Sequence, residues 1–419
     1  MRQALSLVLL LFTLSCLGQD FQYRQTIDSL CSPSFGGRGY VDQGAPKAAQ
    51  YIGAQFKKIG LKPLTKKYQQ YFSFPVQTFP GSCSFVLDKD NTLVPGKDFI
   101  VDPASSAVQA NQFKLVFCNA AKLYQGVNNF KPCPANHILV VQAFGFGGDT
   151  NKVLQTRLLE LKQFAPTIEL IEKKLTWSVS QKASAYPAFK ILSSAISLDA
   201  KEAFIDLDAQ FYSKFQTSNV VGFLKAKKNA KHKPFIVLTA HYDHLGKMGQ
   251  DTYFPGANDN ASGVGMLLYI ANELSNYRNP EFNYAFIAFG GEEAGLVGSN
   301  YFVAHPLIEL NSIRFLLNTD IMGSGEQGIT LVNATLFNEE FELLNKINKD
   351  GNFVSEIKSR GPAANSDHYY FTQAGVPSFF IYTMGPNKHY HDIDDCSSQL
   401  SYAAFEPLAQ LFLRFLSSF

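Results

Sequence analysis

Long apolar segments that end in ionisable side chains constrain the fold of this chain more than any other feature. Such segments recur from residue 219 to the C-terminus and alternate with stretches whose apolar residues have helical spacing; they read NVVGFLKA, PFIVLTA, NYAFIAF, IRFLLN, GITLV and PSFFIYT. Strands that are apolar on both faces are buried on both faces, as in a mostly parallel sheet between layers of helices. We therefore predict an α/β protein in which residues 212–419 form a three-layer α/β/α sandwich with a mostly parallel mixed sheet.

The region before residue 212 has two parts of different texture. Residues 19–81 contain the segment KAAQYIGAQFKKIG, whose apolar residues have helical spacing, and we assign them to the same α/β domain. Residues 82–211 carry short apolar runs separated by turn residues, with a helical stretch at 153–164. Apolar and polar residues then alternate from Ile205 to Phe211, which predicts a half-exposed strand. We therefore predict that 82–211 is an inserted, β-rich domain.

The first 18 residues have the composition of a secretory signal peptide. Arg2 precedes a nearly uncharged apolar run from Ala4 to Leu17, which is shorter than the ~20 residues that span a bilayer. We expect cleavage after Gly18 and export to the periplasm or the extracellular space. Two alternatives are lipidation of Cys16, which would anchor the chain to a membrane, and a buried N-terminal helix. No later apolar run is long enough to cross a bilayer, so we expect no membrane span.

Charge and cysteine content restrict the partners of the chain. It has 37 Lys plus Arg against 35 Asp plus Glu, for a formal net charge of +2, which gives no field that would attract nucleic acid. The sequence contains 6 cysteines, and an exported chain permits disulfides. Cys118 and Cys133 are the nearest pair in sequence and form our candidate bridge, although spacing alone leaves the connectivity open.

Acidic and histidine side chains follow the apolar segments one after another. These residues are His241, Asp243, Asp259, Glu292, Glu293, Asp320 and His391. Ligands of open α/β sheets bind beyond the carboxyl ends of the strands, so we expect these side chains at one shared edge. Each of them could alone be explained as a helix cap, a turn residue or a solvated charge. Their occurrence in order, at successive strand ends, favours a shared site.

Histidines and carboxylates in this number suit a pair of zinc ions. Zinc accepts both ligand types, but one tetrahedral ion with an open position cannot use two histidines and three carboxylates. Two ions about 3.5–4 Å apart can share a bridging carboxylate and a water. One carboxylate must stay off the metals to take the proton from that water. Adjacent Glu292 and Glu293 point in different directions, so one can be the base and the other a ligand.

The segments that carry these residues resemble the two-zinc exopeptidases of the aminopeptidase Y and glutamate carboxypeptidase type. They read AHYDHLG, GANDNASGVGMLL, FGGEEAGLVGSNYF, LNTDIMG, SDHYYF and YHDIDD. The resemblance covers residues 219 to the C-terminus and, more loosely, residues 27–64. It implies a metallo-exopeptidase, a peptide hydrolase that binds two Zn²⁺ per chain.

The resemblance also implies a role for each site residue. It assigns His241 and Asp320 to one zinc, Glu293 and His391 to the other, and Asp259 to a bridge between them. Glu292 is implied to be the general base and later the proton donor. Asp243 is implied to orient His241, as metal-bound imidazoles usually require. A cis peptide between Asp259 and Asn260 is a further implication.

Three other histidines are weaker candidates for a role in the site. His389 could compete with His391, which we prefer because the spacing to Asp395 matches the resemblance. His244 receives no metal role. His368 lies in the SDHYYF segment and is interpreted either as a pocket residue or as a satisfied core histidine.

We expect an exported zinc-dependent aminopeptidase that hydrolyses N-terminal residues from peptides through a metal-bridged water, with Glu292 as general base. Its partners would be peptides with a free N-terminus.

The alternative is a carboxypeptidase or dipeptidase of the same family, which a carboxylate-binding arginine in the pocket would favour. The nearest candidates for that arginine are Arg314 and Arg360. A glutaminyl cyclase-like acyltransferase would use one zinc, and a non-enzymatic relative would lack ligands or the base. The complete ligand set argues against both.

The inserted domain resembles a protease-associated domain in position and texture, and we expect it to shape access to the site.

Overall fold

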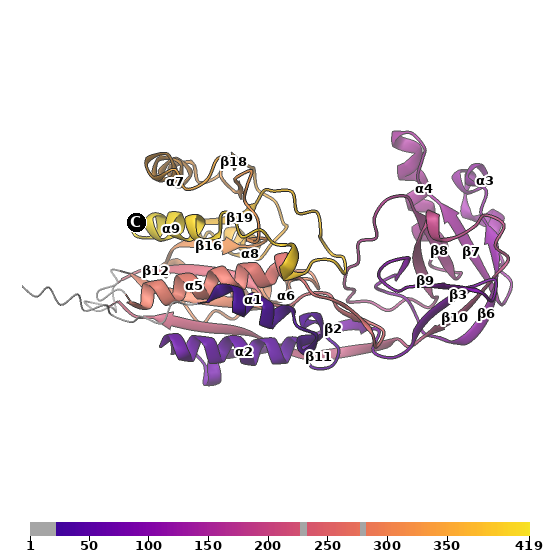
Figure 1. Ribbon diagram of the computed structural model, residues 1–419, viewed down its shortest axis with the longest axis horizontal. Helices are drawn as coiled ribbons and strands as arrows, with labels where there is room; N and C mark the ends of the chain where they lie inside the picture. The colour runs from indigo at the N-terminus through magenta and orange to yellow at the C-terminus, as the bar shows by residue number, and fades with distance from the viewer. Residues whose placement is uncertain (1–21, 227–232, 277–281) are drawn as a thin grey trace, which may run out of the picture.

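The chain folds into two lobes that lie side by side (Figure 1). The computed structural model describes residues 22–226, 233–276 and 282–419. The larger lobe is a sheet between layers of helices, and the smaller lobe is built around a second sheet from the segment between Cys83 and Leu207. The predicted signal peptide, with Cys16, lies outside the described residues.

A nine-stranded sheet forms the centre of the larger lobe. Its strands lie in the order β1-β11-β15-β12-β16-β19-β17-β18, and β2 pairs with β11. The bounds are β1 Lys62–Pro63, β2 Gln69–Thr78, β11 Gln210–Leu224, β12 Phe235–His241, β15 Asn283–Phe289, β16 Ile313–Thr319, β17 Ile329–Val332, β18 Ile357–Ser359 and β19 Ser378–Thr383. The central strands β15, β12, β16 and β19 are parallel, whereas β11 and β17 run antiparallel to their neighbours β15 and β19. The predicted mixed sheet with parallel strands is confirmed.

Helices cover both faces of this sheet because its central strands are apolar on both faces. In β15, Ala285 and Ile287 pack with apolar residues of α6 and α8, whereas Tyr284 and Phe286 pack on the opposite side with α1, α2, α5 and α9. The helices are α1 Tyr23–Cys31, α2 Gly44–Ile59, α5 Ser262–Asn276, α6 Val297–Ala304, α7 Asn338–Gly351, α8 His368–Gln373 and α9 Phe405–Leu416. The three-layer α/β/α arrangement is therefore confirmed.

An eight-stranded sheet forms the smaller lobe, in the order β4-β3-β10-β6-β7-β8-β9-β5. Its elements are β3 Cys83–Leu87, β4 Asn91–Leu93, β5 Phe99–Val101, β6 Val108–Phe117, β7 His137–Gln142, β8 Thr167–Ile171, β9 Ala188–Leu192, β10 Glu202–Leu207, α3 Ala120–Gln125 and α4 Gly148–Leu161. Phe85, Phe99 and Phe189 contact one another in a separate hydrophobic core. This core is a cluster separate from those on the main sheet, and Leu245, Met248 and Phe254 of the larger lobe pack into it.

The alternating segment from Ile205 to Phe211 is not one strand, so this prediction is wrong. β10 ends at Leu207 and pairs within the smaller lobe, whereas β11 begins at Gln210 and returns the chain to the main sheet. The first part of β11 pairs with β2 only, as a two-stranded ribbon between the lobes. Phe211 on this ribbon is 44% exposed, because neither core covers it. Apolar and polar residues keep alternating between Leu207 and Gln210, so the sequence pattern does not show that one strand ends and another begins there.

The candidate bridge between Cys118 and Cys133 is also wrong, because both are free thiols. The two cysteines lie at the margin of a small hydrophobic cluster under α3 and α4. Burial raises the pKa of the Cys118 thiol to about 12. Nearness in sequence does not provide the Cβ geometry that a disulfide needs.

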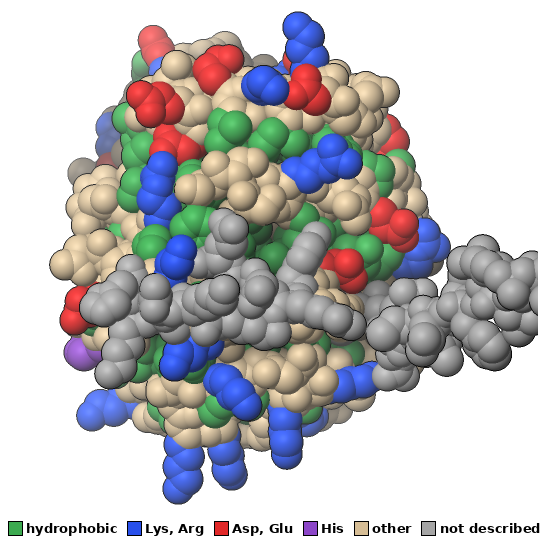
Figure 2. All heavy atoms as spheres, turned by 90° about the vertical axis from the view of Figure 1, so that its left-hand side faces the viewer, with side chains coloured by type: hydrophobic (Ala, Val, Ile, Leu, Met, Phe, Trp, Pro, Cys, Tyr) green, Lys and Arg blue, Asp and Glu red, His purple; other side chains and the backbone are tan. Residues whose placement is uncertain are grey.

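Charged side chains of both signs lie on the end of the larger lobe that faces away from the smaller one. Figure 2 shows Lys and Arg side chains that project singly from this end, with Asp and Glu among them. This mixture agrees with the formal net charge of +2. Within residues 22–226, 233–276 and 282–419, no helix has the length and apolar character needed to cross a membrane.

Candidate metal centre

The ionisable residues singled out in the sequence meet at the carboxyl ends of the parallel strands. His241 is the last residue of β12, and Asp320 directly follows β16. Asp259 lies in the short turn that leads into α5, and Glu292 and Glu293 follow β15. His391 comes from the loop after β19. Each apolar strand therefore delivers polar side chains to the same edge of the sheet.

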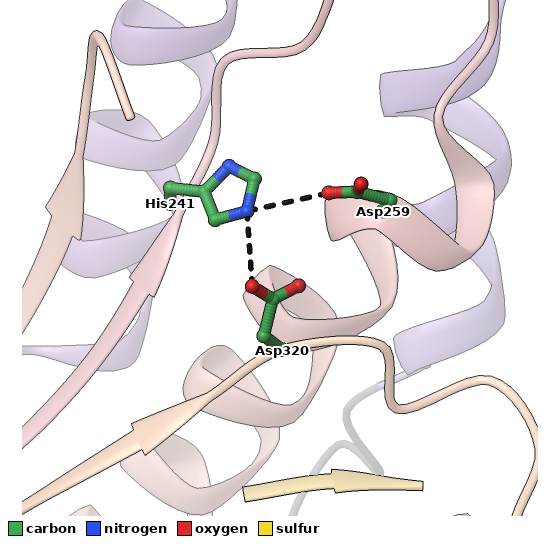
Figure 3. Close-up of side chains that lie close together, drawn as sticks. All are labelled: His241, Asp259 and Asp320. Atoms are coloured by element: carbon green, nitrogen blue, oxygen red, sulfur yellow. Dashed lines mark ion pairs between the residues drawn. The ribbon is translucent and has the colours of Figure 1, made fainter. Parts of the chain in front are cut away.

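One imidazole faces two carboxylates at the first candidate metal position. The Nε2 atom of His241 lies 3.3 Å from Asp259 Oδ1 and 3.3 Å from Asp320 Oδ2 (Figure 3). All three side chains are buried, and their ligand atoms lie close enough together to hold one ion. Asp320 Oδ1 is buried and has no hydrogen-bond partner among the residues that the structure describes. An orphaned carboxylate oxygen in such a site fits a metal ligand, because a buried polar atom otherwise needs a partner.

A second imidazole faces two carboxylates on the other side of Asp259. The Nε2 atom of His391 lies 3.1 Å from Asp259 Oδ2 and 3.2 Å from Glu293 Oε2. The two oxygens of Asp259 thus point to different imidazoles, as a bridging carboxylate requires. The peptide between Asp259 and Asn260 is cis, as the resemblance implies. Two histidines and three carboxylates in this arrangement fit two zinc ions.

Charges in the site perturb one another's pKa values. Burial opposes protonation of His391, but Glu293 and Asp259 outweigh burial and raise its pKa to about 11. The pKa of His241 is raised well above its usual range, because Glu292 and Asp320 outweigh the same opposing effect of burial. Burial would raise the pKa of Glu293, but His391 and His244 lower it to about 2. The contact of Glu293 with His391 therefore favours an ionised carboxylate beside a positive charge.

Glu292 lies beside both clusters, and its ligand atom is close enough to those of His241 and Glu293 for the three to hold an ion. Its Oε2 atom lies 3.9 Å from His241 Nε2, farther than either Asp259 or Asp320. Burial, opposed by His241 and reinforced by repulsion from Glu293, raises the pKa of Glu292 well above its usual range. A carboxyl group with a raised pKa beside a reaction site suits proton transfer.

Asp243 contacts the site differently from what the resemblance implies. The Nδ1 atom of His241 lies 3.2 Å from the main-chain oxygen of Asp243 and 4.0 Å from its carboxylate. The carboxylate instead accepts hydrogen bonds from the backbone N–H groups of Glu292 and Glu293. It also accepts a hydrogen bond from the hydroxyl of Tyr40 at 2.7 Å. Asp243 orients His241 through its backbone, and through its carboxylate it holds the turn of the two glutamates.

Two residues that support the site, Arg38 and Tyr40, were not predicted from the sequence, and a third, Asp395, was noted only for its spacing from His391. Arg38 is fully buried and donates to main-chain oxygens around the site, including those of Tyr242 at 2.8 Å and Gly256 at 2.7 Å. Tyr40 binds Asp243, as described above. The carboxylate of Asp395 accepts hydrogen bonds from the backbone N–H groups of Asn258, at 2.8 Å, and Asp259, at 3.0 Å. Arg38 and Tyr40 lie in the glycine-rich segment GGRGY, whose sequence alone predicts no more than a loop.

The remaining histidines take different places. His244 is fully buried, and its Nδ1 atom donates to Glu293 Oε1 at 2.7 Å, so it contacts a proposed ligand. It could hold an ion with Asp259 and Glu293, but His391 lines the open cavity and His244 does not. His389 lies 3.4 Å from Asp392 and is not a cavity residue. His368 is buried against Phe380.

An open cavity of about 200 Å³ gives access to the metal positions. Its polar wall consists of His241, Asp259, Glu292, Glu293, Asp320 and His391. Ile321, Phe380, Tyr382 and Tyr390 add apolar surface, and the ring of Tyr390 stacks on that of His391. Arg360 also lines the cavity and donates to the hydroxyl of Tyr382 at 3.2 Å, whereas Arg314 pairs with Glu340 elsewhere. The cavity therefore combines candidate metal ligands, aromatic walls and an arginine.

The smaller lobe contributes to the site through one segment. The backbone N–H of Trp177 donates to the main-chain oxygen of His391 at 3.0 Å. In return, the Nδ1 atom of His391 donates to the main-chain oxygen of Trp177 at 2.9 Å. Lys174 pairs with Asp392, next to His391, at 2.7 Å. The second lobe therefore contacts the loop that carries a proposed metal ligand.

Comparison with known proteins identifies relatives of this region. Residues 219–416 match the model of peptidase family M28. Aminopeptidase YwaD of Bacillus subtilis is 33% identical over 211 residues, which span 48% of this chain and 44% of that protein. The match therefore covers less than half the length of this curated relative.

Solved structures share the fold over nearly the whole chain. BSAP, a zinc aminopeptidase from Bacillus subtilis, superposes with a TM-score of 0.70 at 20% identity, covering 94% of this chain and 93% of that one. An aminopeptidase from Aneurinibacillus sp. strain AM-1 superposes with a TM-score of 0.63 at 20% identity, covering 96% and 94%. At this identity the likeness establishes the two-lobed fold alone.

Proposed function

Residues 219–416 belong to peptidase family M28, and on this premise we propose that the chain is an exported zinc-dependent aminopeptidase that removes N-terminal residues from peptides. The curated relative YwaD is an aminopeptidase, and the solved structures of this fold include the zinc aminopeptidase BSAP and the aminopeptidase of Aneurinibacillus sp. strain AM-1. Export is proposed from the apolar run that follows Arg2 in the sequence. Its direct test is the site of N-terminal processing and the compartment in which the mature chain accumulates.

One observation carries the catalytic proposal: the two oxygens of Asp259 face two imidazoles, 3.3 and 3.1 Å away. In the proposed centre, His241 and Asp320 would hold one zinc, Glu293 and His391 would hold the other, and Asp259 would contribute an oxygen to each. Bound zinc would polarise the scissile carbonyl and lower the pKa of a water molecule. The aromatic cavity residues would position the peptide over the two metal positions.

Glu292 is the proposed general base, because it lines the cavity beside the metal positions and lies farther from His241 than Asp259 and Asp320 do. Its carboxylate takes a proton from the attacking water as the new C–O bond forms. The same proton then passes to the amine nitrogen as the C–N bond breaks. The Asp243 carboxylate holds the Glu292 backbone in place during both transfers.

The substrate proposal is tested with matched peptides. A dipeptide amide with a free N-terminus should be cleaved, and its N-acetylated form should not. Exhaustive chelation should abolish cleavage, and added zinc should restore it. Cleavage of the acetylated peptide at an equal rate would contradict the aminopeptidase assignment, and full activity after verified removal of all metal would contradict the zinc assignment.

Arg360 favours a second candidate, a dipeptidase or carboxypeptidase that recognises a free C-terminal carboxylate. Its guanidinium is held by Tyr382 at the cavity, and no ion pair of Arg360 occurs among the described residues. A guanidinium binds a carboxylate through charge-assisted hydrogen bonds.

If the chain is a dipeptidase or carboxypeptidase, dipeptides with a free carboxylate should be cleaved about tenfold faster in kcat/KM than their amides. Arg360→Gln should remove this difference, whereas Arg314→Gln, a matched change outside the cavity, should keep it. Equal rates for dipeptide and amide in the wild type would exclude this candidate.

A further inference from the structure

We propose that Trp177 is a positioning residue of the metal centre, so that the smaller lobe completes the metal position formed by Glu293 and His391; this rests on the proposed two-zinc centre. The main-chain oxygen of Trp177 accepts the Nδ1–H of His391 at 2.9 Å. The backbone N–H of Trp177 donates to the main-chain oxygen of His391 at 3.0 Å. This reciprocal pair joins the two lobes at a proposed ligand.

The hydrogen bond from Nδ1 determines what the other ring nitrogen can do. A carbonyl oxygen only accepts, so the Nδ1 atom of His391 must carry hydrogen. In the neutral imidazole the Nε2 lone pair is then free for a metal. That Nε2 atom is the one that faces Asp259 and Glu293. The Trp177 carbonyl therefore selects the tautomer and the ring direction that metal binding needs.

Lys174 strengthens the same contact from the smaller lobe. Its ammonium lies 2.7 Å from the Asp392 carboxylate and donates to the main-chain oxygens of Lys388, at 2.6 Å, and Tyr390, at 3.1 Å. These three acceptors flank His391 on both sides. His391 itself has a φ of +55°, an uncommon conformation for a residue with a side chain. Lys174 therefore braces the loop at the point where its backbone is strained.

Trp177 is fixed firmly enough to serve as a reference point. Its ring stacks on Phe254 with the centroids 4.6 Å apart, and its indole N–H donates to the main-chain oxygen of Val101 at 2.9 Å. Its side chain is buried, at 4% exposed. The backbone carbonyl that faces His391 is thus held by contacts with both lobes.

The metal position formed by His241 and Asp320 does not depend on a contact with the smaller lobe. The Nδ1 atom of His241 contacts the main-chain oxygen of Asp243, which belongs to the same lobe. The two imidazoles therefore have equivalent backbone partners, but only that of His391 comes from the smaller lobe. Loosening the contact between the lobes should therefore lower the zinc affinity of the position formed by Glu293 and His391 and leave that of the other position unchanged.

The test is zinc retained per chain after equilibration with a graded series of chelator concentrations. Trp177→Ala removes the ring that fixes the carbonyl, and Lys174→Met removes the brace. Each should lower the affinity of one zinc by about 10–100-fold and leave the other unchanged, because loss of a partner of a metal-bound histidine has effects of this size. Trp177→Phe, which keeps a ring against Phe254, should recover most of the affinity.

Lys162→Met is the matched control, because Lys162 pairs with Asp102 and Glu169 inside the smaller lobe. Both zinc ions should be retained in this variant as in the wild type. Wild-type retention of both ions in Trp177→Ala and Lys174→Met would overturn the proposal. Equal weakening of both ions, or the same loss in Lys162→Met, would also overturn it, because the effect would then be a general loss of stability. A wild-type chain that binds no zinc would instead refute the proposed centre.

Discussion

The carboxylate of Asp243 accepts a hydrogen bond from the backbone N–H of Glu292, with 3.1 Å between Oδ1 and N. Asp243 is completely buried and precedes Glu292 by 49 residues in sequence. The contact ties the end of one strand to the turn after its neighbour. It thereby fixes the backbone from which the proposed base and the adjacent proposed ligand extend.

Loss of this support should lower kcat more strongly than it lowers the affinity for zinc. In Asp243→Asn, one carboxylate oxygen is replaced by an amide nitrogen, which cannot accept a hydrogen bond from a backbone N–H group, so the turn of Glu292 and Glu293 should loosen. We expect kcat to fall about 10–100-fold, the size of effect seen for residues that orient a metal site. Steady-state kinetics at saturating zinc measures it. Tyr40→Phe, which removes one donor to the same carboxylate, should have a smaller effect, and an unchanged kcat in Asp243→Asn would contradict the assigned role.

The two adjacent glutamates should behave differently when each becomes glutamine. Glu292→Gln should lower kcat by about 10²–10⁴-fold, because proton transfer is lost, and should retain two zinc ions. Glu293→Gln should lose zinc, because it removes a charged oxygen beside His391. Metal analysis together with single-turnover rates separates these outcomes. Loss of zinc in Glu292→Gln, with full retention in Glu293→Gln, would mean that the two roles are exchanged.

Zinc binding should release protons at pH 7. The pKa of His391 is raised to about 11 and that of His241 lies well above its usual range, so both imidazoles are protonated in the metal-free chain at this pH. A zinc ligand must be deprotonated, so filling both positions should release about two protons from these side chains. Calorimetry in buffers of different ionisation enthalpy counts them. Binding of two zinc ions without net proton release would contradict these charge states.

Arg38 should matter for stability although it lies outside the cavity. Its buried guanidinium donates to main-chain oxygens of Tyr242, Leu30, Pro255 and Gly256. Arg38→Met leaves these oxygens without donors, so we expect the free energy of unfolding to fall by about 3 kcal/mol or more. Lys247→Met, which removes a pair with the exposed Asp42, should cost less than about 1 kcal/mol. Denaturant unfolding of both variants makes the comparison, and equal losses would contradict the account of Arg38.

The sheet and the clustering of site residues could be predicted because each strand carries its own local signal. Continuous apolar runs indicate burial on both faces, and the residue after such a run lies at the ligand-binding edge. His241 and Asp320 follow this rule directly. The break between Leu207 and Gln210 could not be seen, because alternation continues while the strands change sheets.

The supporting residues could not be predicted because their partners are distant in sequence. Arg38 and Tyr40 lie about 200 positions from the residues they bind, and the sequence around them is that of an ordinary loop. Trp177 acts on His391 through its backbone, for which a side-chain pattern gives no signal. The resemblance implies that Asp243 orients His241, but the fold brings the backbone of Glu292 and Glu293 closer to the Asp243 carboxylate.

Zinc-edge anomalous diffraction from crystals grown with zinc tests the central claim most directly. We predict two peaks about 3.5–4 Å apart, one between His241 and Asp320 and one between Glu293 and His391, with an oxygen of Asp259 bound to each. A single peak, or zinc ions that leave Asp259 unbound, would contradict a bridged pair of ions at this edge of the sheet.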